Sequence, residues 1–229
     1  MNFISHFYLD RDRDDSWFFA GVSTPDLVSV FDRNVRLKGP KLPILRENDA
    51  TPAEVSFYHG VLRHFEVDRI FHTSPFFKEE SGLLTSMLQE NFEKGTVKRA
   101  FFVAHVAFEL ILDKILIQED PQLTPSFYSH LEKFPIEEYV KLTEWVTKQK
   151  LPSYQAFMQR FVDKKYLYHY VDWEHLFYVL KRIMIGVGIL EVNYLHSETF
   201  LDLMREYEAG LKDRCYPAFA RLNEQLIEV

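Results

Sequence analysis

The chain contains 229 residues, enough for one sizeable domain that buries roughly 72% of the surface its unfolded chain exposes. Lysine and arginine number 27 against 34 aspartate and glutamate residues, so the net charge is −7 and a basic field over the whole molecule for nucleic-acid binding is disfavoured. The 8 glycines and the aromatic content of 16% exclude collagen-like and disordered chains.

A single cysteine, Cys215, cannot form an internal disulfide; this fits a reducing compartment, and we interpret the residue as a packing residue. The first residues, MNFISHFYLDRDRDD, lack the basic start, the long apolar core and the small-residue cleavage site of a secretory signal. The longest apolar stretch, residues 100–117, is interrupted by a histidine, two acids and a lysine, too often for a membrane-spanning helix. We therefore expect a cytoplasmic protein with no membrane partner.

Proline and glycine divide the chain into segments whose apolar residues recur at spacings of three and four. Alternating β-branched runs joined by Asn-Gly or Asp-Gly turns are missing, so the sequence predicts an all-α protein, a single-domain helical bundle over residues 1–229. Thr51 and Glu54 have the spacing of a capping box, and Thr124 and Ser153 resemble such starts. The predicted helices are 2–9, 16–31, 52–72, 76–93, 96–118, 124–133, 136–149, 153–162, 172–188 and 197–226.

Between two of these helices, residues 33–46 form a loop with proline and glycine and without an acidic residue. In an acidic chain this is a local positive feature. Two interpretations stay open: a solvated loop, or a contact for a phosphate group or an acidic partner. The basic residues of the loop are Arg33, Arg36, Lys38, Lys41 and Arg46.

The predicted helix 52–72 carries His64, Asp68 and His72 at spacings of four, so the three side chains lie on one stripe. Aromatic and aliphatic residues share this stripe, whereas the other charged residues of the helix project elsewhere. The stripe is therefore predicted to face the interior. A buried histidine hydrogen-bonded to Asp68 without a metal ion is the alternative.

The predicted helix 96–118 repeats the pattern with His105, Glu109 and Asp113. Burying a carboxylate is costly unless a cation or dense hydrogen bonding compensates its charge. The alternative is a thin solvent-facing stripe continued by Lys98. Two successive long helices that both direct histidine and carboxylate inward are typical of metal sites in helical bundles, so the sequence predicts a bound cation.

Two further residues are candidate ligands. His6 lies between Phe3 and Phe7 in a short helix, and Asp26 follows a Thr-Pro pair. Asp26 also has a local explanation as compensation of a helix dipole at a helix start. The sequence contains no P-loop, GxGxxG, GxSxG or HExxH motif, so nucleotide-binding, α/β-hydrolase and zincin functions lack support.

At these residues the sequence resembles the acyl carrier protein phosphodiesterase family, also called ACP hydrolase, whose helical fold is related to the HD-domain metal-dependent phosphohydrolases. The opening MNFISHFYL is similar to the family's MNFLAHLHL, with His6 on its histidine. GVSTPDL resembles GNLLADF, with Gly21 and Asp26 matching. The C-terminal REYEAGLKDRCYPAF resembles a tyrosine-rich ending before a Tyr-Pro pair. The resemblance follows the family's order along nearly the whole chain.

The central motif GVLRHFEVDRIFH resembles GIxxHRxIDxxTD, with Gly60, His64 and Asp68 matching, while His72 stands where an aspartate is common. FELILDKIL is similar to LDxxWDHFL and places two acids, at 109 and 113, on its acidic positions. Lys114 replaces the histidine of the family's Asp-His pair. His105, one turn upstream of the first acid, is a candidate substitute for that histidine.

The resemblance implies metal-dependent hydrolysis of the phosphodiester that joins 4′-phosphopantetheine to serine in holo-acyl carrier protein. Because the net charge of the chain opposes attraction of an acidic partner, a small phosphoester is the alternative substrate. His72 and His105 would transfer protons or support the ligands, and the loop 33–46 would contact the partner. The rival hypothesis is a non-catalytic binding or structural domain that kept the HD-like scaffold; Lys114 favours it, because a lysine near a metal competes with the ion. The expected ligands of one or two divalent ions, Mn²⁺, Mg²⁺ or Fe, are His6, Asp26, His64, Asp68, Glu109 and Asp113.

Overall fold

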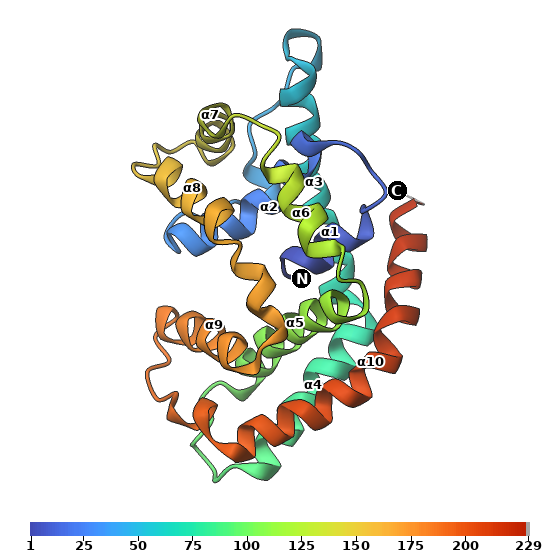
Figure 1. The fold of residues 1–229 in the computed structure, drawn as a ribbon, viewed down its shortest axis with the longest axis vertical. Coiled ribbons are helices and arrows are strands. Elements are labelled where there is room, and N and C mark those ends of the chain that lie inside the picture. The colour runs from blue at the N-terminus through green and yellow to red at the C-terminus, as the bar shows by residue number, and fades with distance from the viewer. Residues whose placement is uncertain (228–229) are drawn as a thin grey trace. The chain divides into compact units, whose positions relative to one another are not determined.

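A computed structural model of the chain describes residues 1–227, which form ten α-helices joined by loops and short 3₁₀ turns (Figure 1). No β-strand occurs within these residues, so the all-α prediction is confirmed. The helices are α1 (Phe3–Leu9), α2 (Ser16–Phe31), α3 (Pro52–Thr73), α4 (Pro75–Asn91), α5 (Ala100–Glu119), α6 (Leu123–Leu131), α7 (Ile136–Thr147), α8 (Tyr154–Lys164), α9 (Trp173–Gly186) and α10 (Glu198–Ile227); the 3₁₀ turns are η1 (Gly39–Lys41), η2 (Glu47–Asp49), η3 (Tyr166–Val171) and η4 (Asn193–His196).

The chain divides into two compact units. The first unit comprises Met1–Ser5, Arg69–Asp120 and the chain from Tyr168 onwards, and the second comprises His6–Asp68 and Pro121–Leu167. These segments alternate along the chain, and α1 and α3 each contribute residues to both units. No single cut in the sequence separates the units, and the expectation of one domain stays a prediction. None of the helices within the described residues is long and apolar enough to cross a lipid bilayer.

The predicted helix starts agree with the structure at some positions and differ from it at others. The capping box at Thr51 is confirmed, because its N–H and hydroxyl both donate to the Glu54 carboxylate at 2.7 and 2.9 Å. The start expected at Thr124 is wrong, since α6 begins one residue earlier and buries Thr124. Ser153 precedes α8 but has a left-handed φ of 69° and makes no side-chain cap. A left-handed φ of 51° at Arg99 also delays α5 beyond its predicted start.

In the second unit, the backbones of α2 and α3 approach each other closely at two glycines. A Cβ on Gly21 would lie 2.0 Å from the carbonyl oxygen of Phe57, and a Cβ on Gly60 would lie 2.0 Å from that of Phe18. Any side chain larger than hydrogen would separate the two helices. This reciprocal contact brings the polar residues that follow each glycine close together.

The rest of the second unit is held by aromatic packing and a buried chain of hydroxyl groups. The Phe7 ring from α1 contacts Phe19 of α2 and Phe127 of α6, at centroid distances of 4.7 and 5.7 Å. The hydroxyl of Tyr139 in α7 lies 3.1 Å from that of Thr24 in α2 and 3.0 Å from a tyrosine hydroxyl of α8. These polar contacts are buried and paired, so they tie α7 and α8 to α2 without leaving an unsatisfied group.

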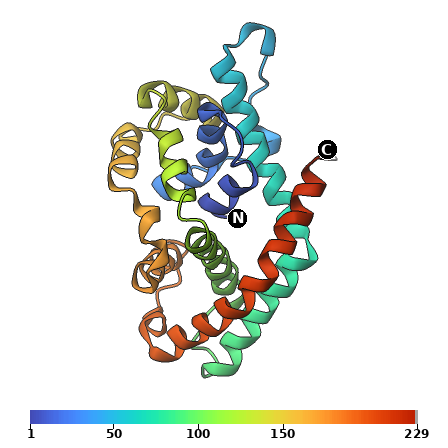
Figure 2. The ribbon, with the colours of Figure 1, turned by 45° about the vertical axis from the view of Figure 1, so that its right-hand side comes forward.

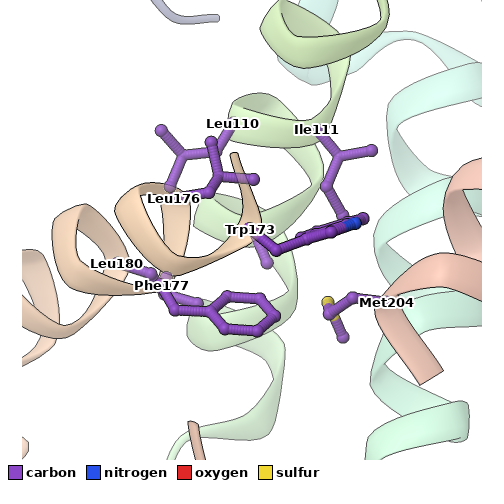
Figure 3. A pocket seen from close by; sticks show the side chains of 8 residues that line it. Leu110, Ile111, Trp173, Leu176, Phe177, Leu180 and Met204 are labelled. Atoms are coloured by element: carbon purple, nitrogen blue, oxygen red, sulfur yellow. The ribbon is translucent and has the colours of Figure 1, made fainter. Parts of the chain in front are cut away.

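In the first unit, α4 packs along α5, and α10 runs beside α4 (Figure 2). Helix α9 covers another side of α5: Leu176 and Phe177 face Leu110 and Ile111 around an apolar pocket of about 10 Å³ (Figure 3). This space holds no more than a water molecule, so we interpret it as a packing feature. Cys215 of α10 is buried and unpaired by any disulfide, which confirms its packing role.

The glycine contact generates a stability prediction. Gly60→Ala forces a Cβ into the α2 backbone and is expected to lower the free energy of unfolding by about 1–3 kcal/mol or more. Gly82→Ala in α4 is the matched control, because a Cβ there meets nothing within 4 Å; it should stabilise by about 0.5–1 kcal/mol. Urea unfolding measures both, and equal effects of the two substitutions would contradict the close approach.

Candidate metal centre

Four of the predicted ligands lie together in the second unit: His6 from α1, Asp26 from α2, and His64 and Asp68 from α3. The Asp68 carboxylate spans the Nε2 atoms of the two imidazoles, with Oδ1 3.3 Å from Nε2 of His6 and Oδ2 3.6 Å from Nε2 of His64. Asp26 Oδ1 lies 4.0 Å from the same His64 nitrogen. The inward orientation predicted for His64 is confirmed, since the residue is buried.

The hydrogen bonding of His64 defines which nitrogen faces the carboxylates. Its Nδ1 lies 2.9 Å from the carbonyl oxygen of Val22, which can only accept, so Nδ1 carries the proton and Nε2 keeps its lone pair. Burial, followed by the charge of the neighbouring His6, holds the pKa of His64 well below its ordinary value. The His6 ring is stacked on it at 4.1 Å. His64 is thus neutral at pH 7, the form that binds a metal ion.

The four predicted ligands differ in exposure: the two imidazoles are buried and the two carboxylates are partly open to solvent. The side chains of His6 and His64 are 2% and 4% exposed, whereas those of Asp26 and Asp68 are 27% and 29% exposed. Metal bonds of about 2.0–2.6 Å place two ligands of one ion roughly 3–4 Å apart, which matches the separations of 3.3–4.0 Å in this structure. Two imidazoles and two carboxylates fit a divalent ion such as Mn²⁺ or Fe²⁺.

Asp26 reaches this site from the interior of α2, not from a helix start. Helix α2 continues through Pro25 to Phe31, and Asp15 provides the cap by accepting a hydrogen bond from the N–H of Phe18 at 3.0 Å. The alternative role of Asp26 as dipole compensation at a helix start is therefore wrong. Its position follows from the packing of α2 against α3.

The basic loop belongs to the same unit and is anchored beside α3. Gly39 lies against the ring of Phe65, the residue after His64: a Cβ on Gly39 would lie 3.4 Å from that ring. Lys148, the residue that follows α7, donates to the carbonyl oxygen of Lys41 at 2.9 Å. These contacts hold the loop backbone, while most of its basic side chains face solvent: Arg36, Lys38, Lys41 and Arg46 are exposed and Arg33 is half-buried.

Glu109 lies in the first unit, where three nitrogen atoms converge on its Oε1. The Nε2 atoms of His72 and His105 lie at 3.0 and 2.9 Å, and the α-amino group of Met1 lies at 3.2 Å. Burial raises the pKa of Glu109, but the amino group and the two imidazoles more than offset burial and hold the pKa below its ordinary value. The carboxylate is therefore ionised at neutral pH. The proton-transfer role expected of the two histidines stays a prediction.

Asp113 is fully buried, so the solvent-facing alternative for this stripe is wrong. Its carboxylate accepts hydrogen bonds from the N–H groups of Ile4 and Ser5 at 3.0 and 2.7 Å and from the Ser5 hydroxyl at 2.5 Å. These N–H groups are at the start of α1 and have no partner within that helix. Both oxygens of Asp113 are thus used to cap α1, and we do not include this predicted ligand in the candidate centre.

Lys114 is engaged away from the acids of α5. Its Nζ lies 2.5 Å from Oε1 of Glu208 in α10 and 4.8 Å from the ring centroid of Trp173 in α9. The residue is buried, so its charge is compensated by an ion pair and a cation–π contact. These contacts give Lys114 a structural role in the first unit, so its presence is not by itself a sign that a metal site was lost.

Two features escaped the sequence analysis. His169, Asp172 and His175 form an exposed cluster whose possible ligand atoms lie within 4.8 Å of one another; spacings of three, rather than four, would have found it. A pocket of about 500 Å³ lies between α4 and α10. Phe76, Phe219 and other residues that line this pocket include none of the predicted ligands.

No family model, curated protein or solved structure matches this chain. Membership of the acyl carrier protein phosphodiesterase family therefore stays a prediction.

The cap of α1 generates a prediction about pH. Burial raises the pKa of Asp113 to about 6, so the folded chain holds a proton that the unfolded chain, with its lower pKa, has lost. Stability should fall by up to about 3 kcal/mol as the pH rises from about 4 through 6. Asp113→Asn should remove this slope. Urea unfolding at several pH values measures it, and an unchanged slope in the variant would contradict the assignment.

Proposed function

We propose that this chain is a divalent-metal-dependent phosphoester hydrolase whose ion is held by His6, Asp26, His64 and Asp68. The observation that carries the proposal is the convergence of His6, Asp26 and His64, whose ligand atoms all lie within 4.8 Å of one another. The carboxylate oxygens of Asp68 lie 3.3 and 3.6 Å from the two imidazoles. Carboxylates that are partly withdrawn from water, as Asp26 and Asp68 are, are stabilised by a nearby positive charge. A divalent ion supplies that charge.

Each residue has a distinct part in this proposal. When bound, a divalent ion lowers the pKa of a water molecule and polarises a phosphoryl oxygen. The Val22 carbonyl orients His64 through Nδ1, as partners of metal-binding histidines commonly do. Asp68 lies within 3.3–3.6 Å of both imidazoles and aligns them. The partly exposed carboxylates of Asp26 and Asp68 leave the solvent side open to water and substrate.

The substrate class rests on the sequence resemblance and on the basic loop. The resemblance favours the phosphodiester of holo-acyl carrier protein, in which 4′-phosphopantetheine is joined to serine. Exposed Lys38 and Lys41 on a loop anchored beside α3 support a contact with an acidic partner. The net charge of −7 opposes long-range attraction of such a partner. A small phosphoester is therefore the alternative substrate.

The first test of the proposal is metal binding with turnover. Asp68→Asn should lower Mn²⁺-dependent hydrolysis of a generic phosphodiester by roughly 100-fold or more. Removing a residue that only supports a ligand typically lowers metal affinity or activity by about 10–100-fold, and removing a ligand itself should lower them at least as much. His59→Asn, at an exposed position of the same helix, is the matched control and should keep full activity. Bound metal, measured by elemental analysis, should fall in parallel with activity.

Three outcomes of this experiment separate the hypotheses. Metal bound through Asp68 with turnover supports the hydrolase. Metal bound without hydrolysis of any phosphoester supports the non-catalytic helical domain. A protein that binds no metal, and whose melting temperature is unaffected by added Mn²⁺, refutes the proposed centre.

A second test addresses the partner. Holo-acyl carrier protein incubated with the chain and Mn²⁺ should lose its prosthetic group, as measured by intact mass. Lys38→Glu combined with Lys41→Glu should reduce this reaction several-fold at low salt and less at high salt, because exposed charges are screened. Hydrolysis of a small phosphodiester should stay unchanged. An unchanged mass of the carrier protein would reject it as the substrate and leave the metal centre standing.

A further inference from the structure

The first unit contains a separate group of metal-ligating side chains around Glu109. His72 comes from the last turn of α3, and His105 and Glu109 come from α5, one turn apart. Both imidazoles direct Nε2 to the same carboxylate oxygen, at 3.0 and 2.9 Å. Their ring centroids are 5.1 Å apart. One ligand atom from each of the three residues therefore lies within 4.8 Å of the other two.

We propose that His72, His105 and Glu109 bind a divalent transition-metal ion, as a second centre independent of the proposed hydrolase site. Two imidazoles and one carboxylate on one side of an ion are a donor set used for Fe²⁺, Co²⁺ and Zn²⁺. Two ligands at roughly 2.1 Å from an ion and at right angles are about 3 Å apart. The separations of 2.9 and 3.0 Å meet this requirement without a change of helix position.

The surroundings hold the imidazoles in place on one side and leave the other side accessible. Buried Phe77 of α4 contacts both imidazole rings edge-on, at centroid distances of 4.8 Å each. The packing of α4 along α5 fixes this wall. The side chains of His72 and His105 are 31% and 26% exposed. An ion therefore has a path from solvent, and coordination positions remain for water or a small ligand.

The carboxylate of Glu109 supplies the negative charge of this group, and the α-amino group of Met1 lies 3.2 Å from its Oε1. A divalent ion at the same oxygen would compete with this ammonium charge, and its bonds to both imidazoles would offset the competition. Neutral imidazoles act as ligands only when Nε2 is free of its proton, so each histidine would keep its proton on Nδ1.

The test uses Co²⁺, whose visible absorption reports its ligands, on the full chain after treatment with a chelator. Wild-type protein should bind two equivalents. His105→Asn and Glu109→Gln should each bind one, Asp68→Asn should bind one, and the combined Asp68→Asn, His105→Asn variant should bind none. His59→Asn, exposed on α3, is the control and should bind two. Far-UV circular dichroism and the melting temperature without metal establish that each variant is folded.

The outcomes distinguish the two centres. If Asp68→Asn abolishes all binding while His105→Asn and Glu109→Gln keep the wild-type stoichiometry, the second centre is refuted and the hydrolase site stands. If binding is lost in His105→Asn but is unchanged in Asp68→Asn, the second centre stands and the hydrolase site fails. Should a variant not fold, the wild-type protein decides the question. Paramagnetic Co²⁺ should broaden the imidazole NMR signals of His72 and His105, and sharp signals at saturating Co²⁺ would refute the centre.

Discussion

The backbones of α2 and α3 touch at Gly21 and Gly60, and the candidate metal centre depends on that contact. A Cβ at either glycine would come within 2.0 Å of a carbonyl oxygen of the other helix. Asp26 and His64 follow these glycines by five and four residues, so the close approach brings a carboxylate of α2 within 4.0 Å of an imidazole of α3. The same approach places the Val22 carbonyl where it accepts the Nδ1 proton of His64. One steric constraint therefore sets both the ligand geometry and the tautomer.

Buried or half-buried carboxylates on α3 and α5 are compensated in three different ways. Asp113 accepts three hydrogen bonds from the start of α1, although burial still raises its pKa to about 6. Glu109 is surrounded by two imidazoles and an amino group. Asp68 has two imidazoles beside it, and burial makes one of them, His64, a poor base. Burial raises the pKa of Asp68, but neighbouring positive charge, including that of His6, more than offsets burial and holds this pKa well below its ordinary value, so the carboxylate is ionised.

The same residue types thus support different chemistry according to what packs against them. A histidine and an acid four residues apart occur on both α3 and α5, yet only the pair on α3 is joined by a second buried imidazole and a second carboxylate. The pair on α5 is completed by His72 against an aromatic wall. Lys114, next to Asp113 in sequence, is directed to Glu208 and Trp173 instead of to the acids of its own helix.

The sequence by itself determined the ten helices and the inward stripe of His64 and Asp68, because local periodicity and proline and glycine positions decide helix extent and facing. It also indicated His6 and Asp26 as candidate ligands, from weak local patterns that a family resemblance then strengthened. Tertiary structure alone decided which distant partner each acid meets: that Asp113 caps α1, and that His72 of α3 joins Glu109. His72 and Glu109 are 37 residues apart, and Ile4 and Asp113 are 109 residues apart. Spacing along one helix carries no information about which backbone N–H or imidazole a neighbouring helix will present.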